Sequence, residues 1–331
     1  MPVPVRRRTL VAVVLVAVTV ILAGSWFGFS GRQGLTPVEP SGPAAEGIDQ
    51  LYLFIGFFAA LIFLSVMIPL ALILSRYRER NLPRDAEGPQ IRGNTRLELM
   101  WTGASILVVA ILVGFTLYAA PGIEDPARAG DEANALDIQV EGRQFYWRYV
   151  YPNGAVAIDR LRLPVDRLAR LHITAPEWDV VHSYWIPALG GKRDAIPGEV
   201  NELELLPERT GVFDGKCGEL CGLQHSAMNF EAEVLTAEEF DAWVEQAAEG
   251  EELGQTMWED VCSKCHFAAP EYAPNIAGNP LLGDADAITQ IVTQGRGRMP
   301  AVGRGWTERE LEALTEYLAT LAPQEEGDDG G

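Results

Sequence analysis

The sequence predicts a multidomain membrane protein with a transmembrane α-hairpin, an all-β domain and a small all-α domain at the C-terminus. Three observations lead to this fold class. Residues 51–75 and 99–121 are apolar and uncharged, residues 136–235 contain short, partly alternating segments, and residues from 254 onward have helical patterns around a Cys-x-x-Cys-His motif. At 331 residues, the chain is long enough for several domains.

The two apolar stretches predict a two-helix anchor over residues 45–121. Each stretch exceeds the roughly 20 residues that a helix needs to cross a bilayer, and a backbone in hydrocarbon must satisfy its own hydrogen bonds. The connector at residues 76–96 is rich in arginine, which by the positive-inside rule places it in the cytoplasm. We therefore expect a multi-pass protein of the bacterial cytoplasmic membrane, with everything after residue 121 on the periplasmic or extracellular side.

A further apolar run, residues 9–31, follows Arg6, Arg7 and Arg8. The basic start and the small residues 23–25 indicate a secretory signal peptide. An uncleaved transmembrane helix is the alternative for residues 1–30, and both interpretations agree with the predicted orientation.

The charge of the chain is strongly negative and uneven. The net charge is −20, and residues 236–331 contain 20 acidic and 5 basic residues. Such a surface disfavours nucleic acid and favours a basic protein partner; an acidic face that only meets solvent is the alternative. Residues 323–331 form an acidic tail with the composition of a disordered segment.

The part after the anchor divides by its patterns. Residues 135–235 contain short strands separated by Pro, Gly or Asn, as in a small β-sandwich or barrel. Residues 236–253 predict a helical linker, opened by the capping box Thr236-x-x-Glu239. Residues 254–322 predict helices, the last one capped by Thr307 and Glu310.

The motif Cys262-Ser-Lys-Cys265-His266 is the attachment signature of a c-type haem. Two thiols on one turn bond to the porphyrin, and the histidine that follows ligates the iron. Met299 is the candidate for the opposite axial ligand, which would suit electron transfer. A zinc site would need more ligands, and a thiol redox pair would need a βα junction. This segment resembles a class I cytochrome c domain.

A second group of soft ligands lies in the loop KCGELCGLQHSAMNF. Cys217, Cys221, His225 and Met228 follow one another at spacings that let one loop turn them to a common point, and His182 adds an imidazole from a distant strand. Thiolate, imidazole and thioether together favour copper, in the manner of cupredoxin sites. A zinc site without the methionine and a disulfide between the two cysteines remain alternatives at this stage.

The segments DVVHSYWIPALGGKRDAIPG, CGELCGLQHSAMNF and GRQFYWRYVYP, with the two preceding helices, resemble cytochrome c oxidase subunit II. The resemblance implies a cupredoxin domain with a dinuclear CuA centre of two copper ions. The implied ligands are the side chains of His182, Cys217, Cys221, His225 and Met228 and the backbone carbonyl of Glu219. The Glu219 carboxylate would reach a magnesium ion at the interface with subunit I. With the appended haem domain, the chain resembles the fused subunit II of a caa-type oxidase.

Three further positions are compared with this family. Phe145 stands where the family usually has a tryptophan that receives electrons, so Phe145 and Trp147 mark the region where electrons would enter. We expect a tethered haem domain to relax the need for that tryptophan, because a short flexible linker gives an effective concentration of roughly millimolar. Glu98 matches a glutamate at the mouth of a proton pathway. The alternative is an ordinary acidic residue in the first turn of a helix, where the helix dipole favours negative charge.

The resemblance implies a subunit that passes electrons from an external donor through haem c and CuA to haem a of subunit I, where oxygen is reduced with proton pumping. Implied partners are subunits I and III, membrane lipid and a basic donor, such as a cytochrome c or a bc-type complex. The subunit itself would do no oxygen chemistry. The alternatives are a CuA subunit of a nitric oxide reductase and a stand-alone membrane-tethered electron carrier; a quinol oxidase subunit would have lost copper ligands that are present here.

Overall fold

The computed structural model describes residues 39–76, 90, 92–127, 131–250, 252–267 and 273–323. The predicted signal peptide or additional helix at residues 1–30 therefore lies outside the described residues. The same holds for most of the arginine-rich connector and for nearly all of the acidic tail.

The N-terminal unit contains two long apolar helices, α2 (Pro43–Arg76) and α3 (Thr95–Glu124). Their most apolar windows have mean hydropathies of 2.8 and 2.3, and no part of these windows is buried inside the protein. The two helices contact each other through Phe54 and Phe115, whose stacked rings lie 4.0 Å apart. Long helices with apolar residues on every side fit a lipid environment. The predicted transmembrane α-hairpin is confirmed in this respect.

The β domain consists of two five-stranded sheets. The first contains, in spatial order, β3 (Val156–Ile158), β2 (Tyr146–Val150), β1 (Leu136–Arg143), β5 (Ala169–Thr174) and β8 (Asn201–Leu205). The second contains β4 (Arg160–Pro164), β10 (Asn229–Leu235), β9 (Gly211–Cys217), β6 (His182–Trp185) and β7 (Arg193–Ala195). The pairs β1–β5 and β10–β4 are parallel, and the other pairs are antiparallel. The predicted all-β domain is confirmed.

The alternation in the sequence explains why these strands face each other as a sandwich. Buried and half-buried residues alternate along β5 and β10, so each strand presents one apolar face to the core. Aromatic rings fill the middle of that core: Tyr184 stacks on Phe230 at 4.5 Å and meets Trp147 edge to face at 4.8 Å. A side chain at Gly215 of β9 would lie only 2.2 Å from the Phe230 ring, so the ring requires a glycine there.

The C-terminal part is helical. It contains α4 (Ala237–Glu249), α5 (Leu253–Met257), the π-helical turn Trp258–Cys262, α6 (Ser263–His266), α7 (Ala285–Gln294) and α8 (Glu308–Thr320). Short 3₁₀ turns lie at Asp131–Asn134, His225–Ala227 and Pro280–Gly283. Both predicted capping boxes are present, with Thr236 and Thr307 as the N-caps. The predicted all-α domain is confirmed.

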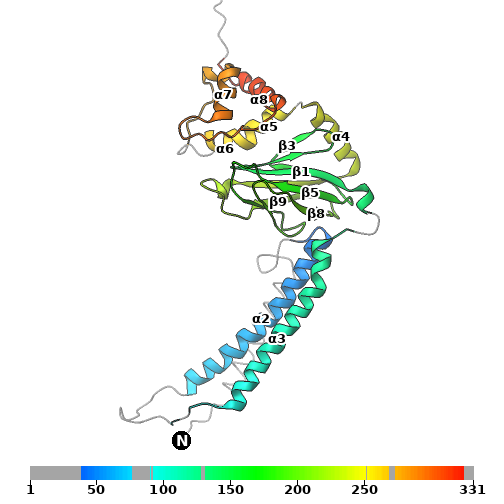
Figure 1. Cartoon of the computed structure of the whole chain (residues 1–331), viewed down its shortest axis with the longest axis vertical. Helices are drawn as coiled ribbons and strands as arrows, with labels where there is room; N and C mark the ends of the chain where they lie inside the picture. The colour runs from blue at the N-terminus through cyan, green and yellow to red at the C-terminus, as the bar shows by residue number, and fades with distance from the viewer. Residues whose placement is uncertain are drawn as a thin grey trace, which may run out of the picture. The chain divides into compact units, whose positions relative to one another are not determined.

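The β domain and the C-terminal helices belong to one compact unit, which comprises residues 41–45 and 124–331. Helices α5 to α8, yellow to red in Figure 1, lie together beside the strands of the β domain. Tyr146 of β2 and Ile158 of β3 are buried in the same apolar cluster as Leu253 and Met257 of α5. The two domains are therefore joined by a shared core as well as by the α4 connection.

Candidate metal centre and cofactor cavity

The loop after β9 brings the predicted soft ligands together. The Sγ atoms of Cys217 and Cys221 lie 3.8 Å apart, and Cys221 Sγ lies 3.7 Å from Met228 Sδ and 3.6 Å from His225 Nδ1. Cys217 ends β9, whereas Met228 directly precedes β10, so the two strands hold both ends of the loop. Three of these side chains, those of Cys217, Cys221 and Met228, are buried.

The second imidazole comes from β6, which pairs with β9. Side-chain ligand atoms of His182, Cys217 and Cys221 all lie within 4.8 Å of one another, and this is the only such cluster among the described residues. His182 Nε2 lies 3.2 Å from the buried carboxylate of Asp179. His182 Nδ1 is buried and has no hydrogen-bond partner among the described residues. The ring is thus oriented with one nitrogen held by a carboxylate and the other left for a ligand.

The electrostatics of the loop favour a thiolate at Cys217. The contact between the two sulfurs lowers the pKa of Cys217 and raises the pKa of Cys221. Burial lowers the pKa of His182, but Asp179 and Cys217 outweigh it, so its pKa is raised overall. Metal ligands must be deprotonated, so binding of a metal ion to these groups is coupled to the release of their protons.

The donor set fits a copper centre better than the alternatives left open by the sequence. A disulfide requires sulfurs about 2 Å apart, whereas the two cysteines are free and 3.8 Å apart. Four-coordinate zinc would leave one of the converging donors unused. Two thiolates, two imidazoles and a thioether match the soft ligands that copper prefers.

Glu219 contributes its backbone to the same site. Cys217 Sγ lies 3.3 Å from the carbonyl oxygen of Glu219. Residue 219 itself is exposed, so its carboxylate is free to meet a partner. The magnesium site expected there stays a prediction.

The haem motif opens onto a mainly apolar cavity with a volume of about 810 Å³. The lining includes the attachment residues Cys262, Cys265 and His266, and Met299. Most of the remaining lining is apolar, and the 3₁₀ turn Pro280–Gly283, α7 and α8 contribute Leu281, Leu282, Ile288, Ile291, Val292 and Leu318. A planar macrocycle of porphyrin size suits such an apolar slot with few polar groups.

The two axial candidates, His266 and Met299, both line this cavity. Nδ1 of His266 lies 2.8 Å from the carbonyl oxygen of Pro274, which fixes the ring and leaves Nε2 for the iron. Met299 is partly buried, and its backbone pairs with that of Arg296 in a tight turn. Burial raises the pKa of Cys262 to about 12, so its thiol is protonated before attachment. The residues present therefore fit a covalently bound haem.

The remaining predicted positions differ in their surroundings. Phe145 lines the haem cavity and packs against the β-domain core. Trp147 is fully buried, with its ring 6.0 Å from that of His182, so it contacts the copper site from inside and no external donor. Glu98 lies in the first turn of α3, where its carboxylate accepts a hydrogen bond from the backbone N–H of Asn94. Through this contact Glu98 caps the helix. Its role in a proton pathway stays a prediction.

Two positioning residues were missed by the sequence reasoning. Asp179 orients His182, and its other oxygen accepts from the backbone N–H of Gln144. Gln144 in turn donates from Nε2 to the carbonyl oxygen of Cys221 at 2.6 Å. Asp179 could have been found from the sequence, because it stands three residues before the predicted ligand His182. Gln144 could not, because it is far from the loop in sequence.

Comparison with known proteins agrees with this geometry. The transmembrane domain of cytochrome c oxidase subunit II matches residues 32–119, and its periplasmic domain matches residues 155–235. Cytochrome c oxidase cbb3-type subunit III matches residues 247–318. The cytochrome c oxidase subunit 2 of Alkalihalophilus pseudofirmus is 39% identical, over 90% of this chain and 94% of the relative. The chain belongs to the cytochrome c oxidase subunit II family.

Other similar proteins carry the same description. The cytochrome c oxidase subunit 2 of Bacillus sp. (strain PS3) is 27% identical, over 74% of this chain and 80% of that relative. The crystal structure of the periplasmic domain of subunit II of cytochrome oxidase (CoxB) from Bradyrhizobium japonicum is 34% identical over 35% of this chain and 94% of that chain, with a TM-score of 0.33. A subunit II domain implies CuA, and the cytochrome c domain beside it implies haem c.

Proposed function

We propose that this chain is the electron-transfer subunit of an oxygen-reducing, proton-pumping haem–copper oxidase. In this proposal, electrons pass from an external donor through haem c and CuA to haem a of subunit I. The observation that carries it is the convergence of five soft side chains beside a haem cavity in one compact unit, namely His182, Cys217, Cys221, His225 and Met228.

The two metal groups, when bound, supply one-electron donor and acceptor chemistry, and the protein supplies their rigidity. Strand pairs β6–β9 and β9–β10 hold both ends of the ligand loop, and Asp179 holds His182 from behind. Ligands fixed by a closely packed core change position little when the charge of the metal changes. Fast electron transfer needs this property because every rearrangement of ligands adds to the barrier.

The proposed partners and location follow from the family. Subunit I would meet the exposed side of the copper loop, where Glu219 would hold magnesium, and subunit III would complete the complex. Glu98, at the cytoplasmic end of α3, would admit protons. The acidic haem domain would receive electrons from a basic donor. The copper and haem domains would lie outside the bacterial cytoplasmic membrane, where the donor is found.

Metal analysis of the full chain, expressed without partner subunits and purified in detergent, tests this assignment. We expect copper and iron in a ratio of 2:1. Replacing Cys221 by serine should remove copper and leave the haem iron in place. Zinc in the wild-type protein, or a 1:1 ratio, would overturn the dinuclear centre.

Purification with partners tests the oxidase itself. A large partner with haem a and oxygen uptake is expected. A b-type haem partner with nitric oxide uptake would indicate the reductase, and the absence of any partner would indicate a stand-alone carrier.

A further inference from the structure

The contact between the β domain and the haem domain has the character of a protein core. Tyr146 and Ile158 of the β domain are 1% and 0% exposed, and both pack in the apolar cluster of the haem domain. A domain that moves on a flexible tether exposes its contact surface to water each time it separates. Because the residues at this contact are apolar and buried, separation is unfavourable and one fixed arrangement is favoured.

A buried ion pair crosses this contact. Arg148 of β2 donates from Nε to Glu310 Oε1 at 2.6 Å and from Nη2 to Oε2 at 3.1 Å. Glu310 is fully buried, and its Oε2 also accepts from the backbone and hydroxyl groups of Thr307. One carboxylate therefore caps α8 and binds the neighbouring domain with the two-point geometry that arginine favours.

Hydrogen bonds on both sides of the pair continue the contact. The Tyr146 hydroxyl donates to the carbonyl oxygen of Val302 at 2.9 Å and accepts from Trp306 Nε1 at 2.8 Å. Arg143, 4% exposed, donates to the carbonyl oxygen of Arg304 at 2.7 Å. These bonds hold the segment that follows Met299.

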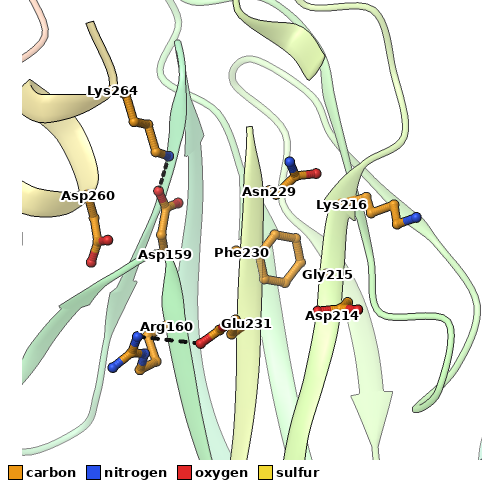
Figure 2. Close-up of a pocket in the computed structure, with 10 residues that line it drawn as sticks. All are labelled: Asp159, Arg160, Asp214, Gly215, Lys216, Asn229, Phe230, Glu231, Asp260 and Lys264. Carbon is orange, nitrogen blue, oxygen red and sulfur yellow. Dashed lines mark hydrogen bonds and ion pairs between the residues drawn. The ribbon is translucent and has the colours of Figure 1, made fainter. Parts of the chain in front are cut away.

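A second ion pair starts inside the haem attachment motif. Lys264, between the two attachment cysteines, pairs with the buried carboxylate of Asp159 and donates to the carbonyl oxygen of Phe145. Figure 2 shows Lys264 reaching from the helical segment to Asp159 at the edge of the strands. The other Asp159 oxygen accepts from the backbone N–H of Trp147 at 2.7 Å.

The fixed contact brings the haem cavity against the copper loop. Leu223 and Gln224 of that loop line the cavity together with Gln144. Gln144 also donates to the Cys221 carbonyl, and Gln224 Nε2 lies 3.7 Å from Cys265 Sγ. Gln144, Leu223 and Gln224 therefore all line the haem cavity. Leu223 and Gln224 belong to the copper loop, and Gln144 is hydrogen-bonded to it.

We propose that Tyr146, Arg148 and Lys264 are positioning residues that lock the haem domain onto the β domain. This inference rests on the proposed function, and it replaces the flexible tether expected from the sequence by a fixed dock. The haem and copper groups, when bound, would exchange one electron with no bond broken and no proton moved, and these residues would keep the two sites at a fixed separation. Gln144 lines the haem cavity and also donates to the Cys221 carbonyl of the copper loop.

Hydrogen exchange of the full chain in its detergent-solubilised complex tests the lock without relying on electron transfer. Arg148→Met leaves the buried Glu310 carboxylate without its cation, which is strongly destabilising, whereas Glu310→Gln removes the two-point pair and leaves Arg148 with Glu141 alone, at 3.4 Å. We expect amides of residues 302–310 to exchange about 100-fold faster in each variant, and the double variant to show less than the product of the two effects. Arg170→Met, which breaks the Arg170–Glu204 pair inside the β domain, is the matched control.

The outcomes separate the lock from the proposed function. Equal exchange in the Arg148→Met and Arg170→Met proteins, or independent effects in the double variant, would overturn the lock while the 2:1 metal ratio stood. If Arg148→Met does not fold, Arg148→Lys keeps the charge but loses the two-point geometry, and faster exchange is again expected. In the wild-type protein, the rate of haem-to-copper transfer should not change when solvent viscosity is raised. A transfer rate that falls in inverse proportion to viscosity would show that the haem domain must move before each electron transfer.

Discussion

Replacing Tyr146 by phenylalanine tests the contact between the two domains at a single atom. The change removes the hydroxyl that bonds to Trp306 Nε1 at 2.8 Å and to the Val302 carbonyl at 2.9 Å. Leaving a buried polar group unpaired costs about 1–3 kcal/mol. The Trp306 N–H is buried and bears this cost in full, whereas the half-buried Val302 carbonyl can bind water. We therefore expect a total of about 2 kcal/mol.

Amide hydrogen exchange measures this loss of stability separately for each segment of the chain. A cost of about 2 kcal/mol corresponds to roughly 30-fold faster exchange wherever the contact must open first. The faster exchange should appear in residues 302–310 and extend into α8, because the Trp306 and Glu310 contacts belong to one interface. The apolar packing of the ring is retained in phenylalanine, so the haem domain should still fold.

Tyr151→Phe provides the matched control. The Tyr151 hydroxyl also has two partners, since it donates to the Arg162 carbonyl at 3.0 Å and accepts from the Arg162 N–H at 2.8 Å. Both partners lie within the β domain, so this variant should lose stability there and leave exchange in residues 302–310 unchanged. Faster exchange of that segment in both variants, or in neither, would refute the reasoning.

Three other changes should have measurable effects. Gly254→Ala would place a methyl group 2.0 Å from the carbonyl oxygen of Ala313, about 1 Å closer than side chains approach, so α5 and α8 must separate and the haem domain should lose about 1–3 kcal/mol in denaturant unfolding. Burial raises the pKa of Glu310, but its arginine partner and the helix cap outweigh burial and hold the pKa below 4.5. The stability that this carboxylate contributes is therefore complete above pH 4.5 and should disappear as the pH falls through the lowered pKa. Amide hydrogen exchange of residues 302–310 measured against pH reports this loss. Asp179→Asn weakens the support of His182, so copper should be lost to a chelator about 10–100-fold more readily.

Each of these changes has a control in the same chain. Gly283→Ala meets only Ala322, at an ordinary distance of 3.8 Å, and should leave the haem domain stable. Glu310→Gln should abolish most of the acid sensitivity of the interface; sensitivity that persists would assign it to other carboxylates. Asp137→Asn alters another aspartate–histidine pair, with His172 at 2.9 Å, in which neither residue is a proposed copper ligand. Copper loss in that variant equal to the loss in Asp179→Asn would contradict a specific role for Asp179.

The metal ligands could be predicted because their chemistry is local. Haem attachment needs two thiols and a histidine within one helical turn, so Cys262, Cys265 and His266 are adjacent in sequence. The copper loop likewise places Cys217, Cys221, His225 and Met228 in the one segment that joins β9 to β10, and the structure brings their side chains to one point. The apolar spans are also local, since a bilayer only requires length and hydropathy.

The sequence by itself therefore determined the domain types, the soft-ligand loop and the haem motif. Only the tertiary structure decided which carboxylate holds His182, that Trp147 is a core residue, and that the haem domain is docked through Arg148 and Glu310. Those contacts join residues as far as 162 positions apart. Any arginine of the chain could pair with any glutamate until the strand register and the packing of α8 bring one particular pair together and exclude water from it.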